Sequence, residues 1–483
     1  MKELVFSLLV LISLFVNGQI EEGKRGIDLV DNHYQVRVVD SVHFYTVHEV
    51  REKALGFLIF KLFDTKFKVV QSHKIQLLKN SELSDFVISN GIVVVLNYSS
   101  SSGDAQWLKW DTKFDEFNSR KVKFQKGIYV KQLWMSDVKY LMIGEVNGEK
   151  NHVWEGYLNS DLSELERLDH LSQSVHVDAF FDDETQQFYL IDRKGPAKNY
   201  ELRIRVYDRI MRGVKDLKIN SDENEFILYE PDLKILGKEE LMISGTYSLP
   251  NSKGANGFYL GKFKANSWEY VKLLDFDQFD QFYYAKDSPV IMEAKANKLR
   301  KESKGKKFDV AVDLVMHPMV YDDSVVYLYA DLFFEKYHTE MITSNQFGNQ
   351  VQQSQQVHDG FMFTHSVVCG ITTEGNKFMD DVNSINLLNP NITPQVTMME
   401  GSHNYLLHHW KDKAFYNELE VSEVKEADRE DLTWEKHSGV KDYRPSFQRW
   451  YGNVYLHFGR RLVKQDKKLF NLEQYHIGTL LVK

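Results

Sequence analysis

Short apolar runs of strand character recur along this chain at nearly regular intervals. Each follows a polar turn, and their centres are Phe44, Val94, Met142, Leu190, Met242, Leu328, Leu407 and Leu456. Successive centres lie 50, 48, 48, 52, 86, 79 and 49 residues apart. A period of this size, built from strand-type segments alone, is typical of β-propellers, in which each repeat forms one blade. The sequence therefore predicts an all-β chain that folds as a single β-propeller.

The same repeat predicts the number of blades and the way the ring closes. Eight centres indicate an eight-bladed ring, with seven blades as the alternative if the terminal units merge. The last unit ends at its third strand, residues 477–482. We expect residues 27–30 to supply the missing fourth strand and to close the ring, because closure removes exposed edge groups.

Two intervals are longer than the rest and predict insertions at about 275–307 and 334–360. Within the first, residues 293–307 carry seven basic and two acidic side chains. A short helix that runs into a flexible loop fits this composition. A solvated surface segment is the simpler interpretation of this first insertion. The alternative is docking on an anionic surface or polymer through Lys298, Arg300, Lys301 and Lys304. The second insertion contains six glutamines and almost no apolar periodicity, so we expect a mobile surface loop that is also a candidate contact region.

The N-terminus has the pattern of a signal peptide. Lys2 precedes an apolar run over residues 4–16, and Val16-Asn17-Gly18 offers a cleavage point before Gln19. The run is shorter than the ~20 apolar residues that span a bilayer. We therefore predict a signal peptide at residues 1–18, a propeller over residues 19–483 without a transmembrane segment, and export to the periplasm, cell surface or medium.

Charge and cysteine content narrow the possible partners and bonds. The formal net charge is −9, from 60 basic and 69 acidic residues, which does not indicate nucleic-acid binding. The single cysteine, Cys369, lies in an apolar strand pattern and is expected to be a buried thiol. We expect a monomer that is held together by its core and by ring closure.

Familiar catalytic and cofactor motifs are absent from the sequence. It contains no His-Glu-x-x-His pair, no phosphate-binding glycine loop, no Gly-x-Ser-x-Gly elbow and no EF-hand loop. We therefore predict no cofactor and no metal site. His176 and Asp178 would share one face of an inner strand, and His317 would end another, so these side chains could converge at the channel. Histidines that bond to backbone or water are the more ordinary interpretation. Five tryptophans could stack on a sugar, although packing between blades explains most of them: Trp107, Trp110, Trp134, Trp154 and Trp268.

Two stretches resemble a known group of sequences. Residues 241–248 read LMISGTYS and are followed by NGFYLGKF at 256–263, and residues 359–370 read DGFMFTHSVVCG. Together with the lysine-rich segment between them, they resemble an uncharacterised family of exported Bacteroidota proteins, known only as a domain of unknown function. The resemblance implies export and carries no catalytic residue. Met379 stands where such sequences tend to have Trp, which argues against a stacking site there.

These observations support two functions from different classes. The leading hypothesis is an exported, non-catalytic propeller scaffold that binds an envelope protein or polysaccharide. The alternative is an extracellular carbohydrate-active enzyme with its site on the propeller axis. An enzyme requires ionisable groups from different blades within hydrogen-bond reach, whereas a binding module requires only an exposed surface.

Overall fold

The structure is a computed structural model in which strands dominate and one α-helix, α2 (Pro289–Glu302), is present among the described residues. The residues described are 26–29, 34–52, 55–84, 86–89, 91–123, 126–135, 139–147, 149–157, 166–167, 174–182, 184–194, 201–210, 212–219, 226–237, 240–250, 252, 254–264, 267–284, 289–304, 310–322, 324–346, 349–392, 395–399, 404–410, 413–419, 430–432, 440–451, 454–463 and 472–481.

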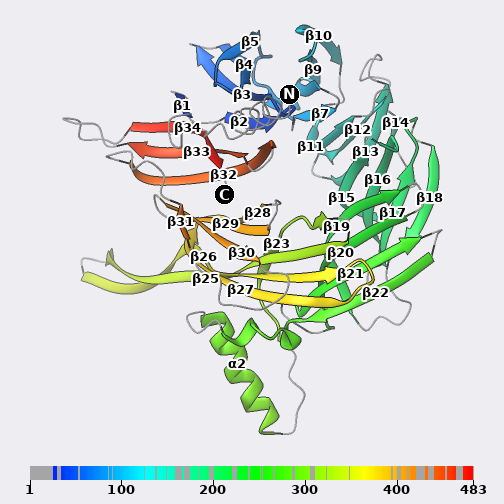
Figure 1. The fold of residues 1–483 in the computed structure, drawn as a ribbon. Coiled ribbons are helices and arrows are strands. Elements are labelled where there is room, and N and C mark those ends of the chain that lie inside the picture. Colours follow the sequence, from blue (N-terminus) through cyan, green and yellow to red (C-terminus); the bar gives the residue numbers. More distant parts are fainter. Residues whose placement is uncertain are drawn as a thin grey trace, which may run out of the picture.

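The described strands form eight antiparallel sheets set around a common centre, so the protein is an all-β propeller (Figure 1). We number the sheets 1 to 8 along the chain. Sheet 1 consists of β2 (Tyr34–Val38), β3 (His43–Glu52), β4 (Leu55–Asp64) and β5 (Val69–Gln76), and sheet 2 consists of β6 (Glu82–Leu83), β7 (Val87–Ser89), β8 (Ile92–Tyr98), β9 (Asp104–Asp111) and β10 (Glu116–Lys123). Sheet 3 consists of β11 (Ile128–Met135), β12 (Lys139–Val146), β13 (Glu149–Tyr157) and β14 (Glu166–Arg167), and sheet 4 consists of β15 (Ser174–Asp182), β16 (Gln187–Lys194), β17 (Glu201–Tyr207) and β18 (Gly213–Lys218).

Sheets 5 to 8 follow the same plan, with longer strands in sheet 6. Sheet 5 consists of β19 (Ile227–Gly237), β20 (Glu240–Ser248), β21 (Gly257–Lys264) and β22 (Ser267–Asp275), and sheet 6 consists of β23 (Leu314–Met316), β24 (Val320–Asp322), β25 (Val325–Gln346), β26 (Asn349–Thr372) and β27 (Lys377–Asn389). Sheet 7 consists of β28 (Val396–Met399), β29 (Asn404–Trp410), β30 (Lys413–Leu419) and β31 (Glu430–Leu432), and sheet 8 consists of β32 (Val440–Tyr451), β33 (Val454–Val463), β34 (Leu472–Leu481) and β1 (Gly26–Leu29).

Burial along each sheet explains why the central strands dominate the sequence pattern. In β8, β12 and β20 nearly every residue is buried, because a neighbouring sheet covers each face. A strand covered on both faces is a continuous apolar run rather than an alternating one. The outermost strands β5, β10 and β22 have one or both faces in solvent and are mostly exposed. The period seen in the sequence is therefore the period of the doubly covered strands.

Aromatic side chains fill the spaces between neighbouring sheets. Trp107 of sheet 2 packs on Tyr140 of sheet 3, with 4.8 Å between ring centroids. Between sheets 8 and 1, Phe44 meets Trp450 edge to face at 5.2 Å. Such pairs contribute about 0.5–1.5 kcal/mol beyond their buried area. The first and last sheets thus share one apolar cluster, which also contains Phe63, Leu456 and Ile477.

The N-terminal strand completes sheet 8. β1 pairs antiparallel with β34, and Ile27 lies opposite Ile477 and Leu29 opposite Tyr475. The sequence predicted this pairing for residues 27–30, and it is present for residues 27–29, whereas Val30 lies outside the described residues. Sheet 8 therefore contains both ends of the described chain.

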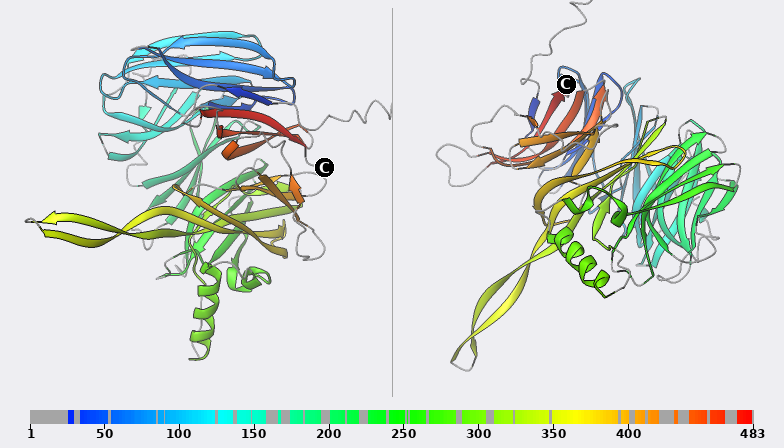
Figure 2. Two further views of the ribbon diagram at one scale, coloured as in Figure 1. Left: turned by 90° about the vertical axis from the view of Figure 1, so that its left-hand side faces the viewer. Right: turned by 60° about the horizontal axis from the view of Figure 1, so that its bottom comes forward.

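The second insertion is not the mobile loop predicted for residues 334–360. β25 and β26 continue past the body of sheet 6 as a two-stranded ribbon with paired residues out to Gln346 and Asn349. Figure 2 shows this ribbon, in yellow-green, twisting away from the molecule. We call its described residues 334–346 and 349–360 the arm. The prediction failed because a ribbon with solvent on both faces has no buried side and hence no apolar periodicity.

The first insertion contains the short helix expected from its composition. The 3-10 helices η3 (Phe276–Gln278) and η4 (Phe282–Tyr284) precede α2, and Phe276 and Phe282 are buried and stacked at 5.5 Å between centroids. Ile291 and Ala294 anchor the start of α2 on this cluster. The flexible loop predicted beyond α2 begins in residues 305–309, which lie outside the described residues.

Within the described part of the chain, no helix is both long and apolar enough to cross a bilayer.

Cys369 is buried in β26, and burial raises the pKa of its thiol. The expectation of a buried cysteine is confirmed.

Candidate functional site on the inner strands

The inner strands of sheets 3, 4 and 5 are interrupted at matching positions. β11 carries a register shift between Val130 and Gln132, and β15 carries one between His176 and Asp178. In β19 the shift spans Tyr229 to Asp232, and Glu230 within it has a left-handed φ of 46°. A bulge inserts an extra residue and redirects the side chains that follow it. In each of the three strands, the residue that resumes pairing is polar: Gln132, Asp178 and Asp232, which we call the inner polar row.

Glycines on two of the partner strands make room for these bulges. A Cβ atom on Gly144 would lie 2.1 Å from the carbonyl oxygen of Tyr129. A Cβ atom on Gly245 would lie 2.4 Å from the carbonyl oxygen of Tyr229. Contacts under 3 Å to backbone cannot be relieved by a side-chain rotation, so only glycine lets the bulged strand approach this closely.

Contacts between sheets connect the members of the inner polar row. Gln132 Nε2 donates to Asp178 Oδ1 at 3.5 Å, which joins sheets 3 and 4. Asp178 and Asp232 repel each other electrostatically across sheets 4 and 5. Asp232 Oδ2 accepts the backbone N–H of Met319 at 2.5 Å, which joins sheet 5 to sheet 6. The three residues of the row therefore lie on neighbouring sheets 3, 4 and 5, and Asp232 also contacts sheet 6. Figure 1 shows their strands, β11, β15 and β19, on the sides of these sheets that face the centre.

Both carboxyl groups of the row are half-buried, and their protonation is perturbed. Burial raises the pKa of Asp178 above its ordinary value of 3.8, and hydrogen bonds from Ala179 and Gln132 oppose that rise. Burial also raises the pKa of Asp232, and the charge of Asp178 adds to the rise. Carboxyl groups with raised pKa values can act as general acids or bases, and as hydrogen-bond partners for hydroxyl groups.

The structure places His176 and Asp178 on β15 and His317 in sheet 6. Asp178 lies in the inner polar row. His176 lies on β15 ahead of the bulge, so the simple alternation that would place it beside Asp178 is interrupted, and its side chain is outside the described residues. His317 is buried in the connection between β23 and β24, where Nε2 lies 2.7 Å from Asp331 Oδ2 and the ring stacks on Tyr329 at 4.3 Å.

The contacts of His317 explain it as a structural residue. Asp331 Oδ2 also accepts the backbone N–H groups of Gln395 and Val396, at 2.6 and 3.2 Å. The buried pair thus ties the entry of β28 in sheet 7 to sheet 6. Among the residues whose side chains are described, no group of three or more histidine, cysteine, aspartate or glutamate residues could hold a metal ion.

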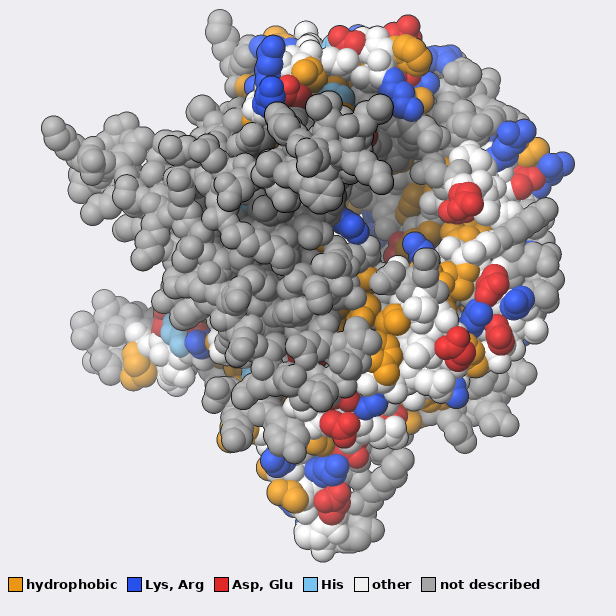
Figure 3. All heavy atoms as spheres, viewed as in Figure 1, with side chains coloured by type: hydrophobic (Ala, Val, Ile, Leu, Met, Phe, Trp, Pro, Cys, Tyr) orange, Lys and Arg blue, Asp and Glu red, His pale blue; other side chains and the backbone are white. Residues whose placement is uncertain are grey.

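The basic residues of the first insertion lie on α2 or just after it, away from the inner strands. Lys298 faces the body, where Nζ donates to Asp277 Oδ1 at 2.6 Å and lies 4.9 Å from the Tyr283 ring centroid. Arg300, Lys301 and Lys304 are exposed at the tip. Figure 3 shows basic, acidic and hydrophobic side chains together at the lower end of the molecule, where α2 projects.

Sequence reasoning missed Gln132 and Asp232. Each lies in a strand in which polar and apolar residues alternate in the usual way, so neither residue stands out. Asp232 also follows a proline. The available signal was a glycine on the partner strand beside the bulge that precedes each polar residue: Gly144 beside the bulge before Gln132, and Gly245 beside the bulge before Asp232. Reading that signal requires the strand register, which the sequence alone does not supply.

Replacing Asp178 and Asp232 together by Asn is expected to stabilise the protein at neutral pH. Because both pKa values are raised, the native state binds protons more tightly than the unfolded state between about pH 4 and the raised values. The stability associated with the protonated carboxyls is present below about pH 4 and is lost as the pH rises through the raised pKa values. Amides do not ionise, so the urea midpoint of the double variant should exceed that of the wild type at pH 7 and the difference should shrink towards pH 4.

The exposed Asp280→Asn variant serves as the control for that measurement. It should leave the difference between pH 7 and pH 4 as in the wild type. A lower midpoint for the double variant at pH 7 would mean that the ionised carboxylates stabilise the ring, and it would contradict the prediction.

Comparison with known proteins yields similarity of fold alone. No protein-family model and no curated protein sequence matches the chain. Among solved structures, it is similar to the polysaccharide lyase Uly1, with 8% identity, a TM-score of 0.39, and coverage of 82% of this chain and 89% of that one. It is also similar to the β-propeller domain of the Trilobed protease from Pyrococcus furiosus, with 11% identity, a TM-score of 0.38, and coverage of 83% and 98%. Oligopeptidase B from Leishmania major matches with 9% identity, a TM-score of 0.42, and coverage of 90% of this chain and 54% of that one.

Proposed function

We propose that this protein is an exported, non-catalytic propeller scaffold that binds a protein partner at the cell envelope through its arm. The arm carries this proposal, because it projects from the sheets as a two-stranded ribbon (Figure 2). Export is proposed from the signal-peptide pattern of residues 1–18.

The backbone of the arm is suited to strand pairing with another protein. β25 pairs with β23 up to Leu332, and β26 pairs with β27 from Phe361 onwards. Residues 334–346 and 349–360 have strand partners only in each other among the described residues. Each arm strand therefore presents one edge of backbone N–H and C=O groups, which is the template used in β-strand addition.

Side chains on the arm add contact surface to these edges. Tyr337 is 49% exposed and Met341 is 64% exposed, which is unusual for large apolar residues. The Tyr337 ring lies 5.1 Å from the ring of His358 on the other strand. His338 bonds to Asp359 and Glu340, and these carboxylates raise the pKa of His338. The arm thus combines apolar anchors with charged groups, as protein-binding surfaces do.

Shortening the arm is expected to abolish capture of the partner without unfolding the ring. Lys336 and Gly360 are direct strand partners, so an Asn-Gly turn in place of residues 337–359 closes the hairpin with a favoured two-residue loop. After cross-linking in native cells and affinity purification, a partner enriched by the full-length chain should be lost with the shortened chain. Melting temperatures of the two chains should agree within about 3 °C, because the arm lies outside the sheet-to-sheet core.

Paired point variants test the same idea without removing any backbone. Tyr337→Ser with Met341→Ser should weaken capture of the same partner. Phe114→Ser with Ile392→Ser removes two other exposed apolar side chains and should not. A partner retained by the shortened chain would refute the role of the arm.

A second function is favoured by the inner polar row. Two carboxyl groups with burial-raised pKa values on adjacent inner strands suit an enzyme that acts on carbohydrate near the propeller axis. Turnover of a polysaccharide that disappears in both Asp178→Asn and Asp232→Asn, while partner capture persists, would favour this function over the scaffold.

A further inference from the structure

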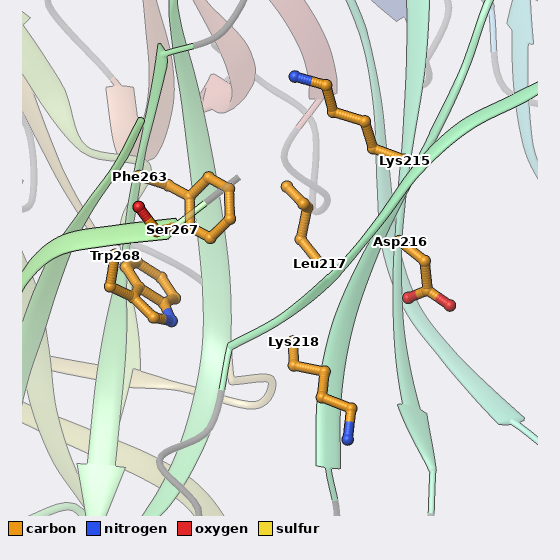
Figure 4. Close-up of a pocket in the computed structure, with 7 residues that line it drawn as sticks. All are labelled: Lys215, Asp216, Leu217, Lys218, Phe263, Ser267 and Trp268. Atoms are coloured by element: carbon orange, nitrogen blue, oxygen red, sulfur yellow. The ribbon is translucent and has the colours of Figure 1, made fainter. Parts of the chain in front are cut away.

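A cavity of ≈ 500 Å³ opens between the outer parts of sheets 4 and 5 (Figure 4). β18 lines one side with residues 215–218, and sheet 5 lines the other with Phe263, Ser267 and Trp268. This volume lies within the range of about 300–1,000 Å³ that is usual for small-molecule sites. None of its lining residues belongs to either insertion, to the arm or to the inner polar row.

The floor of the cavity is apolar and the Trp268 indole forms a wall. Leu217 and Phe263 are buried members of the core shared by sheets 4 and 5. Trp268 lies directly against Gly261 of β21, since a Cβ atom there would be 2.5 Å from Cζ3 of the indole. Phe263 contacts the indole edge to face, at 5.2 Å between centroids and 88°. The strand and Phe263 therefore hold the indole in one orientation beside the cavity.

The charges around the cavity leave one cation unpaired. Asp216 and Lys218 point away from sheet 5 in Figure 4, whereas Lys215 and Leu217 point towards it, as strand alternation requires. Asp216 pairs with Arg203 at 3.4 Å and Lys218 pairs with Glu201 at 3.2 Å. Within the described part of the chain, Lys215 makes no ion pair. The cavity thus presents an indole, a hydroxyl group on Ser267 and one uncompensated ammonium group.

We propose that this cavity binds a sugar ring that carries a carboxylate, as one hexuronate unit of an acidic polysaccharide. The C–H face of a sugar ring packs on an indole in the way that other apolar surfaces do. The Lys215 ammonium would form a charge-assisted hydrogen bond with the carboxylate, and Ser267 would bond to a ring hydroxyl. One cation matches the single carboxylate of each unit.

Two features favour a uronate polymer over other anions. A polyphosphate or nucleic acid recruits several cations at once, whereas here the neighbouring basic side chains, Arg203 and Lys218, already pair with Asp216 and Glu201. The cavity is also open to solvent, so an internal unit of a chain can enter sideways. The site is independent of the arm, and either one can fail without the other.

Affinity electrophoresis of the full chain tests this assignment. Native gels would contain polygalacturonate, alginate or hyaluronate as uronate polymers, and dextran as the neutral control. We expect retardation by at least one uronate polymer and none by dextran. Trp268→Ala and Lys215→Gln should each weaken that binding by roughly tenfold, the loss expected for one stacking platform or one charge-assisted bond.

Matched variants on sheet 2 control for general effects of charge and aromatic surface. Phe114→Ala removes an exposed aromatic ring and Lys121→Gln removes an exposed cation, and both should bind as the wild type does. Lys215→Gln also guards against misfolding of Trp268→Ala, because it replaces one polar side chain by another at the rim of the cavity. The unchanged melting temperature of each variant would be verified first.

Three results of the electrophoresis would overturn the proposal. They are no retardation by any of the three uronate polymers, equal retardation by dextran, and wild-type binding by Lys215→Gln and Trp268→Ala. Calorimetry with free galacturonate distinguishes the two sources of the same chemistry. Equal affinity for the free acid and for the polymer would overturn the assignment to a polymer.

Discussion

A chain that starts at residue 33 should melt about 5–10 °C below a chain that starts at residue 19. The shorter chain lacks β1, which pairs with β34 at four consecutive residues. Each net backbone hydrogen bond contributes about 1 kcal/mol, and loss of β1 also uncovers the edge of β34. That edge lies beside the cluster shared by sheets 8 and 1, in which Ile477 is 0% exposed. The effect should appear in the thermal melt and as increased aggregation on heating.

Proline substitutions test whether the stability comes from the backbone pairing of β1 with β34 or only from the presence of residues 19–32. Adjacent prolines in place of Ile27 and Asp28 remove a donor whichever of the two residues faces β34. Prolines at Gly23 and Lys24, outside β1, provide the matched control. We expect a loss from the first pair close to that of the deletion and none from the second. Equal melting temperatures for all chains would show that β1 does not stabilise sheet 8.

Gly245→Ala is expected to cost roughly 3 kcal/mol, although it adds a single methyl group. That methyl would lie 2.4 Å from the carbonyl oxygen of Tyr229, 2.6 Å from Cε1 of Tyr259 and 2.8 Å from the carbonyl oxygen of Glu230. Two of these contacts are with backbone, so β19 must move away from β20. The bulge that aims Asp232 would move with it, and urea unfolding should show a lower midpoint.

Gly237→Ala, in the same sheet, is the control for this prediction. A Cβ atom there meets nothing within 4 Å, so the substitution should be neutral or should stabilise by about 0.5 kcal/mol through the unfolded chain. If Gly245→Ala unfolds at the same urea concentration as Gly237→Ala, the close approach of β19 to β20 is not what requires glycine.

The sequence predicted the sheets because their central strands are buried on both faces. Leu190 and Met242 lie at the centre of apolar runs, and they occupy β16 and β20 of consecutive sheets. The repeat also indicated that the last unit lacks a fourth strand, which predicted a partner from residues 27–30, and residues 27–29 do pair with β34. Strands that are buried on both faces are recognisable in the sequence as continuous apolar runs, and β16 and β20 are of this kind.

The arm and the candidate sites are harder to predict, because no apolar pattern in the sequence identifies them. Tyr337 and Thr339 favour strands, but the arm gains its order from backbone pairing between two exposed strands, which needs no apolar pattern. The inner polar row depends on bulges, and a bulge is a property of two strands in register. Lys215 and Trp268 are brought together by the packing of sheet 4 on sheet 5, which no local pattern encodes.

The pairing of β1 with β34 also sets an order of events during folding. Gly26 and Gly478 are separated by most of the chain, so their contact has one of the largest loop-closure costs in the molecule. Sheets 2 to 7 can assemble from neighbouring segments as they emerge, whereas sheet 8 must wait until the last strand has been synthesised. Until then, β1 has no partner and the apolar sides of sheets 1 and 7 remain uncovered. Sheet 8 is therefore completed only when the segments at both ends of the described chain are available.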